Sequence, residues 1–89
     1  MAQAKLRITG FVQGVFYRDS ARTVATELDL SGYAKNMPDG SVESVVAGST
    51  ENINKYAQWC ETGPEMARVE NVTIEWTNED TKKDTFEIF

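Results

Sequence analysis

Two kinds of hydrophobic pattern alternate along this chain, and their order constrains the fold more than any other feature. Four stretches have the residue pattern of strands: 5–9, 32–36, 41–47 and 72–76. Two stretches have apolar residues at helical spacing: 17–28 and 51–62. Residues 86–89 form a short final edge segment after the polar turn 77–84. The predicted element order is therefore βαββαβ.

This order predicts an α+β fold of the ferredoxin-like type, in which two helices cover one face of an antiparallel sheet. Pro38 presets a turn and Gly40 accepts a positive φ, so the second and third strands are expected to form a hairpin. The second helix can be capped by Ser49 or Thr50 and ends at 63–64, a Gly-Pro pair. A chain of 89 residues buries only about 60–65% of its unfolded surface, so we expect one domain over 1–89.

The composition excludes several classes of function. The chain has one cysteine and no histidine, so an intrachain disulfide is impossible and a thiolate–imidazole metal site lacks ligands. A formal net charge of −5 disfavours a nucleic-acid partner, because such binders neutralise phosphates with clustered Lys and Arg. No apolar stretch is long enough to span a membrane, and the first ten residues lack the apolar run of a signal peptide. We expect a cytoplasmic monomer without cofactor or metal.

The segment 10–18, GFVQGVFYR, joins the first strand to the first helix and is unusually apolar for a loop. Free N–H groups at a helix N-terminus favour an anion, and glycines let successive N–H groups point inward. Arg18 stands where the helix begins, so its guanidinium can bond two oxygens of a phosphate. Val12, Val15 and Phe16 are expected to anchor this cradle in the core. The segment predicts a rigid phosphate site.

Two motifs resemble those of the acylphosphatase family. The first is met here by Gly10, Val12, Gln13, Gly14, Val15 and Arg18, and the second by Gly32-Tyr33-Ala34-Lys35-Asn36 followed by Gly40, Val42 and Gly48. Both motifs occur in the family's order, and the length and element order of the chain also match. Tyr17 departs from the usual Phe and adds a hydroxyl at a position expected in the core.

The resemblance implies an acylphosphatase, which hydrolyses the carboxyl–phosphate bond of a small-molecule acyl phosphate. It implies that Arg18 is catalytic and binds the phosphate together with the loop, and that Asn36 is catalytic and positions the attacking water. The implied substrate-binding residues are Val12, Gln13, Gly14, Val15, Phe16, Tyr17 and Arg18. The chemistry agrees with the absence of histidine, because a carboxylate leaving group with a conjugate-acid pKa of about 4 departs without a proton from the enzyme.

Other functions are possible for the same element order. A regulatory module could bind an anion in the loop without turnover, but it would not require Asn36. An RNA-recognition module would place aromatic residues on its third strand, and 41–47 has none. A metal carrier would need a cysteine pair in the first loop. Because the chain is acidic, we also expect five cations to gather at the mouth of the site and attract the substrate: Lys5, Arg7, Arg18, Arg22 and Lys35.

Overall fold

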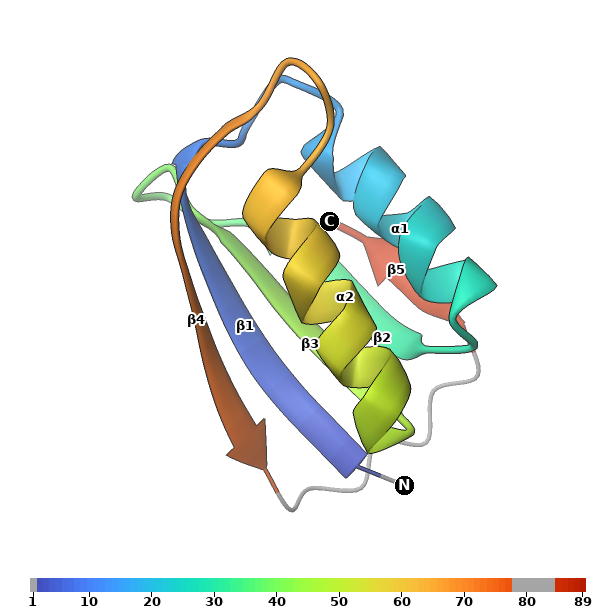
Figure 1. Ribbon diagram of the computed structural model, residues 1–89. Coiled ribbons are helices and arrows are strands. Elements are labelled where there is room, and N and C mark those ends of the chain that lie inside the picture. Colours follow the sequence, from blue (N-terminus) through green and yellow to red (C-terminus); the bar gives the residue numbers. More distant parts are fainter. Residues whose placement is uncertain (1, 78–84) are drawn as a thin grey trace.

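The computed structural model describes residues 2–77 and 85–89 and contains the predicted elements (Figure 1). In chain order they are β1 (Ala2–Phe11), α1 (Tyr17–Glu27), β2 (Ser31–Asn36), β3 (Val42–Gly48), α2 (Thr50–Thr62), β4 (Arg68–Thr77) and β5 (Phe86–Ile88). β1 and β4 extend beyond the stretches that alternate in the sequence, because each pairs with its neighbour over nearly its whole length. The expected turn at 77–84 lies outside the described residues except for Thr77.

The strands form one five-stranded sheet in the order β4-β1-β3-β2-β5. β1 lies antiparallel to both β3 and β4, and β2 and β3 form the predicted antiparallel hairpin. β5 adds to the free edge of β2 in parallel, so the sheet is mixed where an antiparallel one was expected. β5 has three residues, too few for a hydrophobic pattern to indicate its direction. The ferredoxin-like α+β architecture is confirmed.

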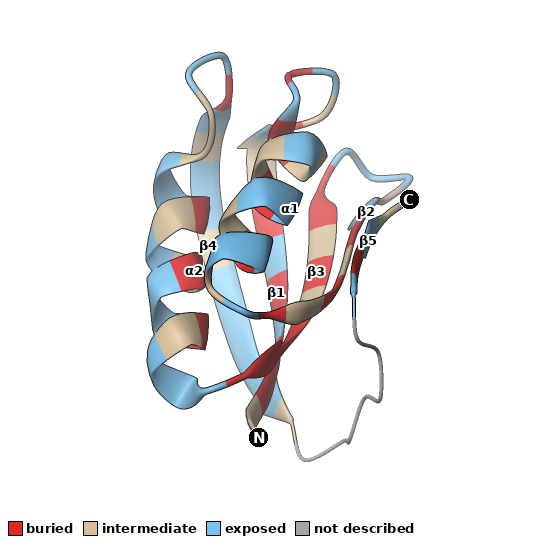
Figure 2. Ribbon diagram, turned by 90° about the vertical axis from the view of Figure 1, so that its right-hand side faces the viewer, coloured by how far each residue is buried: buried red, intermediate tan, exposed pale blue. Residues whose placement is uncertain are grey.

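Both helices cover the same face of the sheet (Figure 1). Alternate residues of β1 point toward them, and Ala4, Leu6 and Ile8 have no exposed surface. The core lies between the sheet and the buried stripes of α1 and α2 (Figure 2). Among the described helices, none is both long and apolar enough to cross a bilayer.

Tyr17 occupies a core position and its hydroxyl has a specific partner. The side chain is 2% exposed, its ring lies 5.4 Å from that of Trp59, and its hydroxyl donates a 2.8 Å hydrogen bond to the carbonyl of Cys60. In a continuing helix that carbonyl would accept from the N–H four residues later, but residue 64 is Pro and has none. Tyr17 therefore satisfies a buried carbonyl that the end of α2 leaves without its helical donor.

Candidate active site

Two valines anchor the loop 12–16 in the hydrophobic core. Val12 and Val15 are 1% and 2% exposed and belong to the core, as predicted. Phe16 was expected to be a third anchor, and this expectation is wrong, because its side chain is 70% exposed. Phe16 takes a left-handed conformation with φ 64° immediately before α1, so the chain turns there and the next residue, Tyr17, enters the core instead.

The loop leaves its backbone N–H groups available to a ligand. Gly14 is also in the left-handed region, with φ 75°, and a Cβ built on it would meet no atom within 4 Å. α1 has no side-chain cap, and its first backbone bond runs from the N–H of Ser20 to the carbonyl of Phe16. Within the described segments, no N–H of residues 12–19 donates to a backbone carbonyl. Such a turn before a helix N-terminus is suited to an anion.

A hollow of about 250 Å³ opens at this turn. It is lined by five predicted site residues, by one further residue of α1 and by one residue of β5: Val12, Gly14, Phe16, Tyr17, Arg18, Asp19 and Ile88. The walls combine apolar side chains with the charged side chains of Arg18 and Asp19 and with the backbone of the turn. Gln13, Val15 and Asn36 do not line it. Nothing in the sequence pattern indicated that Ile88, seventy positions after Arg18, would face the same hollow.

Arg18 and Asn36 meet at a single oxygen atom. Nη1 of Arg18 and the backbone N–H of Asn36 both donate to the backbone oxygen of Phe89, the latter over 3.3 Å. The N–H of Phe89 in turn donates to the carbonyl of Ala34 over 2.9 Å, which continues the pairing of β2 with β5. The end of β5 thus joins the first turn of α1 to the last residue of β2. The motifs predicted both Arg18 and Asn36 as site residues but not this bridge, since a backbone oxygen has no sequence signal.

The side-chain oxygen of Asn36 is an unused acceptor. Asn36 follows Ala34 on the helix-covered face of β2, and its Oδ1 is enclosed without a hydrogen-bond partner among residues 2–77 and 85–89. An enclosed amide oxygen without a partner costs about 1–3 kcal/mol. A polar group left in this state, on a residue whose backbone shares an acceptor with Arg18, is a candidate for function because it can accept a hydrogen bond from a small molecule such as water.

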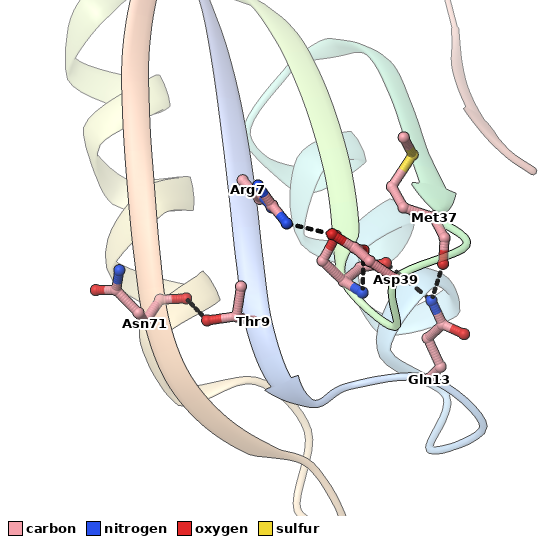
Figure 3. A network of polar contacts seen from close by, with 7 residues as sticks. Arg7, Thr9, Gln13, Met37, Asp39 and Asn71 are labelled. Atoms are coloured by element: carbon pink, nitrogen blue, oxygen red, sulfur yellow. Dashed lines mark hydrogen bonds and ion pairs between the residues drawn. The ribbon is translucent and has the colours of Figure 1, made fainter.

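Gln13 points from the loop toward the hairpin turn. Its Nε2 donates to the carbonyls of Met37 and Ser41, each over 2.9 Å (Figure 3). The turn is also tied internally, because Oδ1 of Asp39 accepts from the N–H and the hydroxyl of Ser41 over 2.9 and 2.6 Å. These bonds hold the pKa of Asp39 below its usual value, with Arg7 adding to the effect. Gln13 was predicted to bind substrate, but its amide nitrogen is engaged by the protein itself.

Three of the five cations expected at the mouth are paired with carboxylates. Lys5 lies 3.2 Å from Glu43 and Arg22 lies 3.2 Å from Asp19, while Arg7 pairs with Asp39. These pairs reduce the field that the cations can exert on a substrate. Arg18 is therefore the one of these five cations that lines the hollow. The ion pairs of Lys5, Arg7 and Arg22 make the positive potential at its mouth smaller than the sequence predicted.

The buried thiol of Cys60 is not suited to act as a nucleophile. Burial raises the pKa of the Cys60 thiol to about 12, so the thiol stays protonated and is a poor nucleophile at neutral pH. In the part of the chain that the structure describes, no cluster of three or more Cys, Asp or Glu residues could hold a metal ion.

The fold and the hollow together define a class, a small ferredoxin-like α+β domain with a turn between β1 and α1 that is suited to an anion. The family model described as Acylphosphatase matches residues 4–88. The chain belongs to the acylphosphatase family. It is 46% identical over 76 residues to the acylphosphatase of Roseiflexus sp., covering 85% of this chain and 82% of that one. It is 44% identical over 81 residues to the acylphosphatase of Hahella chejuensis, covering 91% and 86% of the two chains.

Two solved structures share the fold over its whole extent. The acylphosphatase from Coxiella burnetii superimposes with a TM-score of 0.91 at 37% identity, over 99% of this chain and 92% of that chain. The crystal structure of acylphosphatase from Bacillus subtilis superimposes with a TM-score of 0.96 at 25% identity, over 100% and 99% of the two chains. The family predicted from the two sequence motifs is confirmed.

Proposed function

We propose that this chain hydrolyses acyl phosphates to a carboxylate and inorganic phosphate, with the phosphate held by the 12–18 loop and Arg18 and the attacking water oriented by Asn36. Membership of the acylphosphatase family supports the reaction. The observation that supports the division of roles is the shared bond to the oxygen of Phe89, which places the guanidinium of Arg18 beside the residue with the unused amide oxygen.

The phosphate end of the substrate fits the N–H groups of the turn and the guanidinium. Arg has five N–H donors, so the bond from Nη1 to Phe89 leaves others for phosphate oxygens while it fixes the plane of the guanidinium. A fixed donor set needs no reorganisation when negative charge shifts during phosphoryl transfer. Arg18 and the turn would therefore bind the phosphate and also stabilise the transition state.

Asn36 would act on the water. Its Oδ1 can accept a hydrogen bond and so orient a water for in-line attack on phosphorus. A carboxamide is not a base, so the proton of the water passes to a phosphate oxygen of the substrate. The P–O bond to the acyl group breaks, and its electron pair leaves on the carboxylate, which needs no proton near neutral pH. The products are a carboxylate and phosphate.

The test is hydrolysis of benzoyl phosphate in excess chelator by the wild type and by Arg18→Ala, Asn36→Ala and Lys55→Ala. Arg18→Ala should lose about 10²–10³-fold in turnover and should also bind inorganic phosphate more weakly. Asn36→Ala should lose turnover to a similar extent and keep its phosphate affinity. Lys55→Ala, which removes an exposed cation of α2 that does not line the hollow, should behave as the wild type.

Two outcomes would contradict the proposal. Equal losses of phosphate affinity in Arg18→Ala and Asn36→Ala would refute the separate roles. A folded wild type that binds phosphate in a calorimeter without hydrolysing benzoyl phosphate would indicate a sensor of anions instead of an enzyme.

We propose further that one copy of the chain, a single domain over 1–89, is sufficient for the reaction in the cytoplasm. The residues invoked above all come from one chain and two of them share one acceptor. A single cysteine that is buried and cannot form an intrachain disulfide is compatible with a reducing compartment. Sedimentation at the enzyme concentration of the assay should give the mass of a monomer.

A further inference from the structure

Gln13 links the two halves of the candidate site. It lies in the loop that contains the anion-binding turn, but both of its amide bonds reach the β2–β3 hairpin turn, to Met37 and Ser41 (Figure 3). The same turn is closed by a 2.8 Å bond from the N–H of Met37 to the carbonyl of Ser41. Asn36 immediately precedes Met37, so Gln13 is bonded to the residue after the one that would hold the water.

The other ties of this turn do not come from the loop. Asp39 bonds Ser41 within the turn itself, and Arg7, which reaches Asp39, belongs to β1. On the opposite side, Asn36 is held by the oxygen of Phe89. Among the described side chains of the 12–16 loop, that of Gln13 is hydrogen-bonded to the hairpin turn, so it connects the loop to the end of β2.

We propose that Gln13 is a positioning residue, whose side chain holds Asn36 in register with the phosphate-binding turn and does not itself contact the substrate. This inference rests on the proposed function. Both hydrogens of its Nε2 are used by carbonyl oxygens, so the group has no donor left for a phosphate. A displacement of about 1 Å between catalytic groups can cost roughly 10²-fold in rate, so loss of this tie should lower turnover without removing a binding group.

The test is Gln13→Met, which keeps the length and volume of the side chain but has no donor. We expect kcat for benzoyl phosphate to fall by about 10- to 100-fold while the affinity for inorganic phosphate changes less than about threefold. The matched control is Asn52→Ala. Asn52 also donates a side-chain amide bond to a backbone carbonyl, that of Leu28 over 2.9 Å, but at the opposite end of α2 from the loop (Figure 1). Asn52→Ala should lose about as much unfolding free energy as Gln13→Met and should keep the wild-type kcat.

A double-mutant cycle separates positioning from general structural support. If Gln13 acts through Asn36, then Gln13→Met should have little further effect on the residual kcat of Asn36→Ala, so that the two losses are not additive. Additive losses, a fall in phosphate affinity equal to the fall in kcat, or a wild-type kcat in Gln13→Met would each overturn the proposal. Gln13→Glu provides a second variant of similar size, whose carboxylate cannot donate to the two carbonyls and should also lower kcat.

The failure of this inference is distinguishable from the failure of the proposed function. The latter would be seen as absence of hydrolysis by the wild type, whereas the former requires an active wild type whose kcat does not depend on Gln13. Far-UV circular dichroism of each variant shows whether it is folded before its kinetics are compared.

Discussion

Replacing Tyr17 by Phe tests the account of how α2 ends. The substitution removes one oxygen from a position that is 2% exposed and leaves the ring available to pack against Trp59. The carbonyl of Cys60 then loses its 2.8 Å donor, and Pro64 cannot supply the helical N–H. A buried acceptor left without a partner costs about 1–3 kcal/mol, so the free energy of unfolding should fall by this amount.

The assay is urea unfolding followed by tryptophan fluorescence, with thermal unfolding beside it. The midpoint in urea should fall at an unchanged m value, and Tm should fall by roughly 4–8 °C for each kcal/mol in a domain of this size. kcat for benzoyl phosphate should stay at the wild-type value, because Phe keeps the ring that lines the hollow and the lost hydroxyl is bonded to Cys60, not to Arg18 or Asn36.

Tyr33→Phe is the matched control. It removes a hydroxyl that donates over 2.8 Å to Glu43, in a half-buried position where water can replace the bond, so its cost should be below about 1 kcal/mol. A Tyr17→Phe variant as stable as the wild type, or one no less stable than Tyr33→Phe, would refute the reasoning. The phenylalanine that is usual in the family would then be equally compatible with this helix end.

Two more changes test the loop and the hairpin turn. A Cβ at Gly14 would meet no atom, but the φ of 75° is unfavourable for alanine, so Gly14→Ala should lose about 1–2 kcal/mol of unfolding free energy. Gly14→Asn should lose less, because asparagine adopts left-handed φ values more readily. Equal urea midpoints for the two variants would contradict this account. Asp39 has a pKa held below its ordinary value of 3.8, so its contribution to stability is full above that pH and is lost as the pH falls through the lowered pKa. The urea midpoint of Asp39→Asn should therefore fall less between pH 7 and pH 3 than that of the wild type, and parallel losses would contradict the assignment.

The sequence was sufficient for the order of the elements and for the faces that the two helices, β1 and β3 present to the core. It was not sufficient for β4, in which Ile74 and Trp76 of the alternating apolar set are 38% and 44% exposed. Periodicity reports local geometry, and here each helix and hairpin agrees with its own stretch of sequence. It did not indicate that β5 would run parallel to β2, because three residues contain too little pattern. Nor did it distinguish Phe16 from Tyr17. Two adjacent aromatic residues at a left-handed turn point in different directions, and which one enters the core depends on a φ angle.

The candidate site was predictable in its residues but not in its connections. Arg18 and Asn36 were found through motifs, whereas the oxygen of Phe89 that brings them together belongs to the backbone of a distant strand. The direction of Gln13 was also hidden, since a polar residue between apolar ones can face either a ligand or a neighbouring turn. Long-range hydrogen bonds decide both points, and a single sequence has no local pattern for them.

The position of β1 in the sheet has a consequence for the speed of folding. Gln3 pairs with Ala47 on one side and with Thr77 on the other, so the strand acquires its neighbours only after most of the chain has been gathered. Topologies dominated by such distant pairings fold in roughly milliseconds to seconds, because chain entropy is lost before the contacts form. The 12–18 loop continues directly from this strand. Recovery of hydrolysis after dilution from urea should therefore coincide with recovery of tryptophan fluorescence, with no active species preceding the native state.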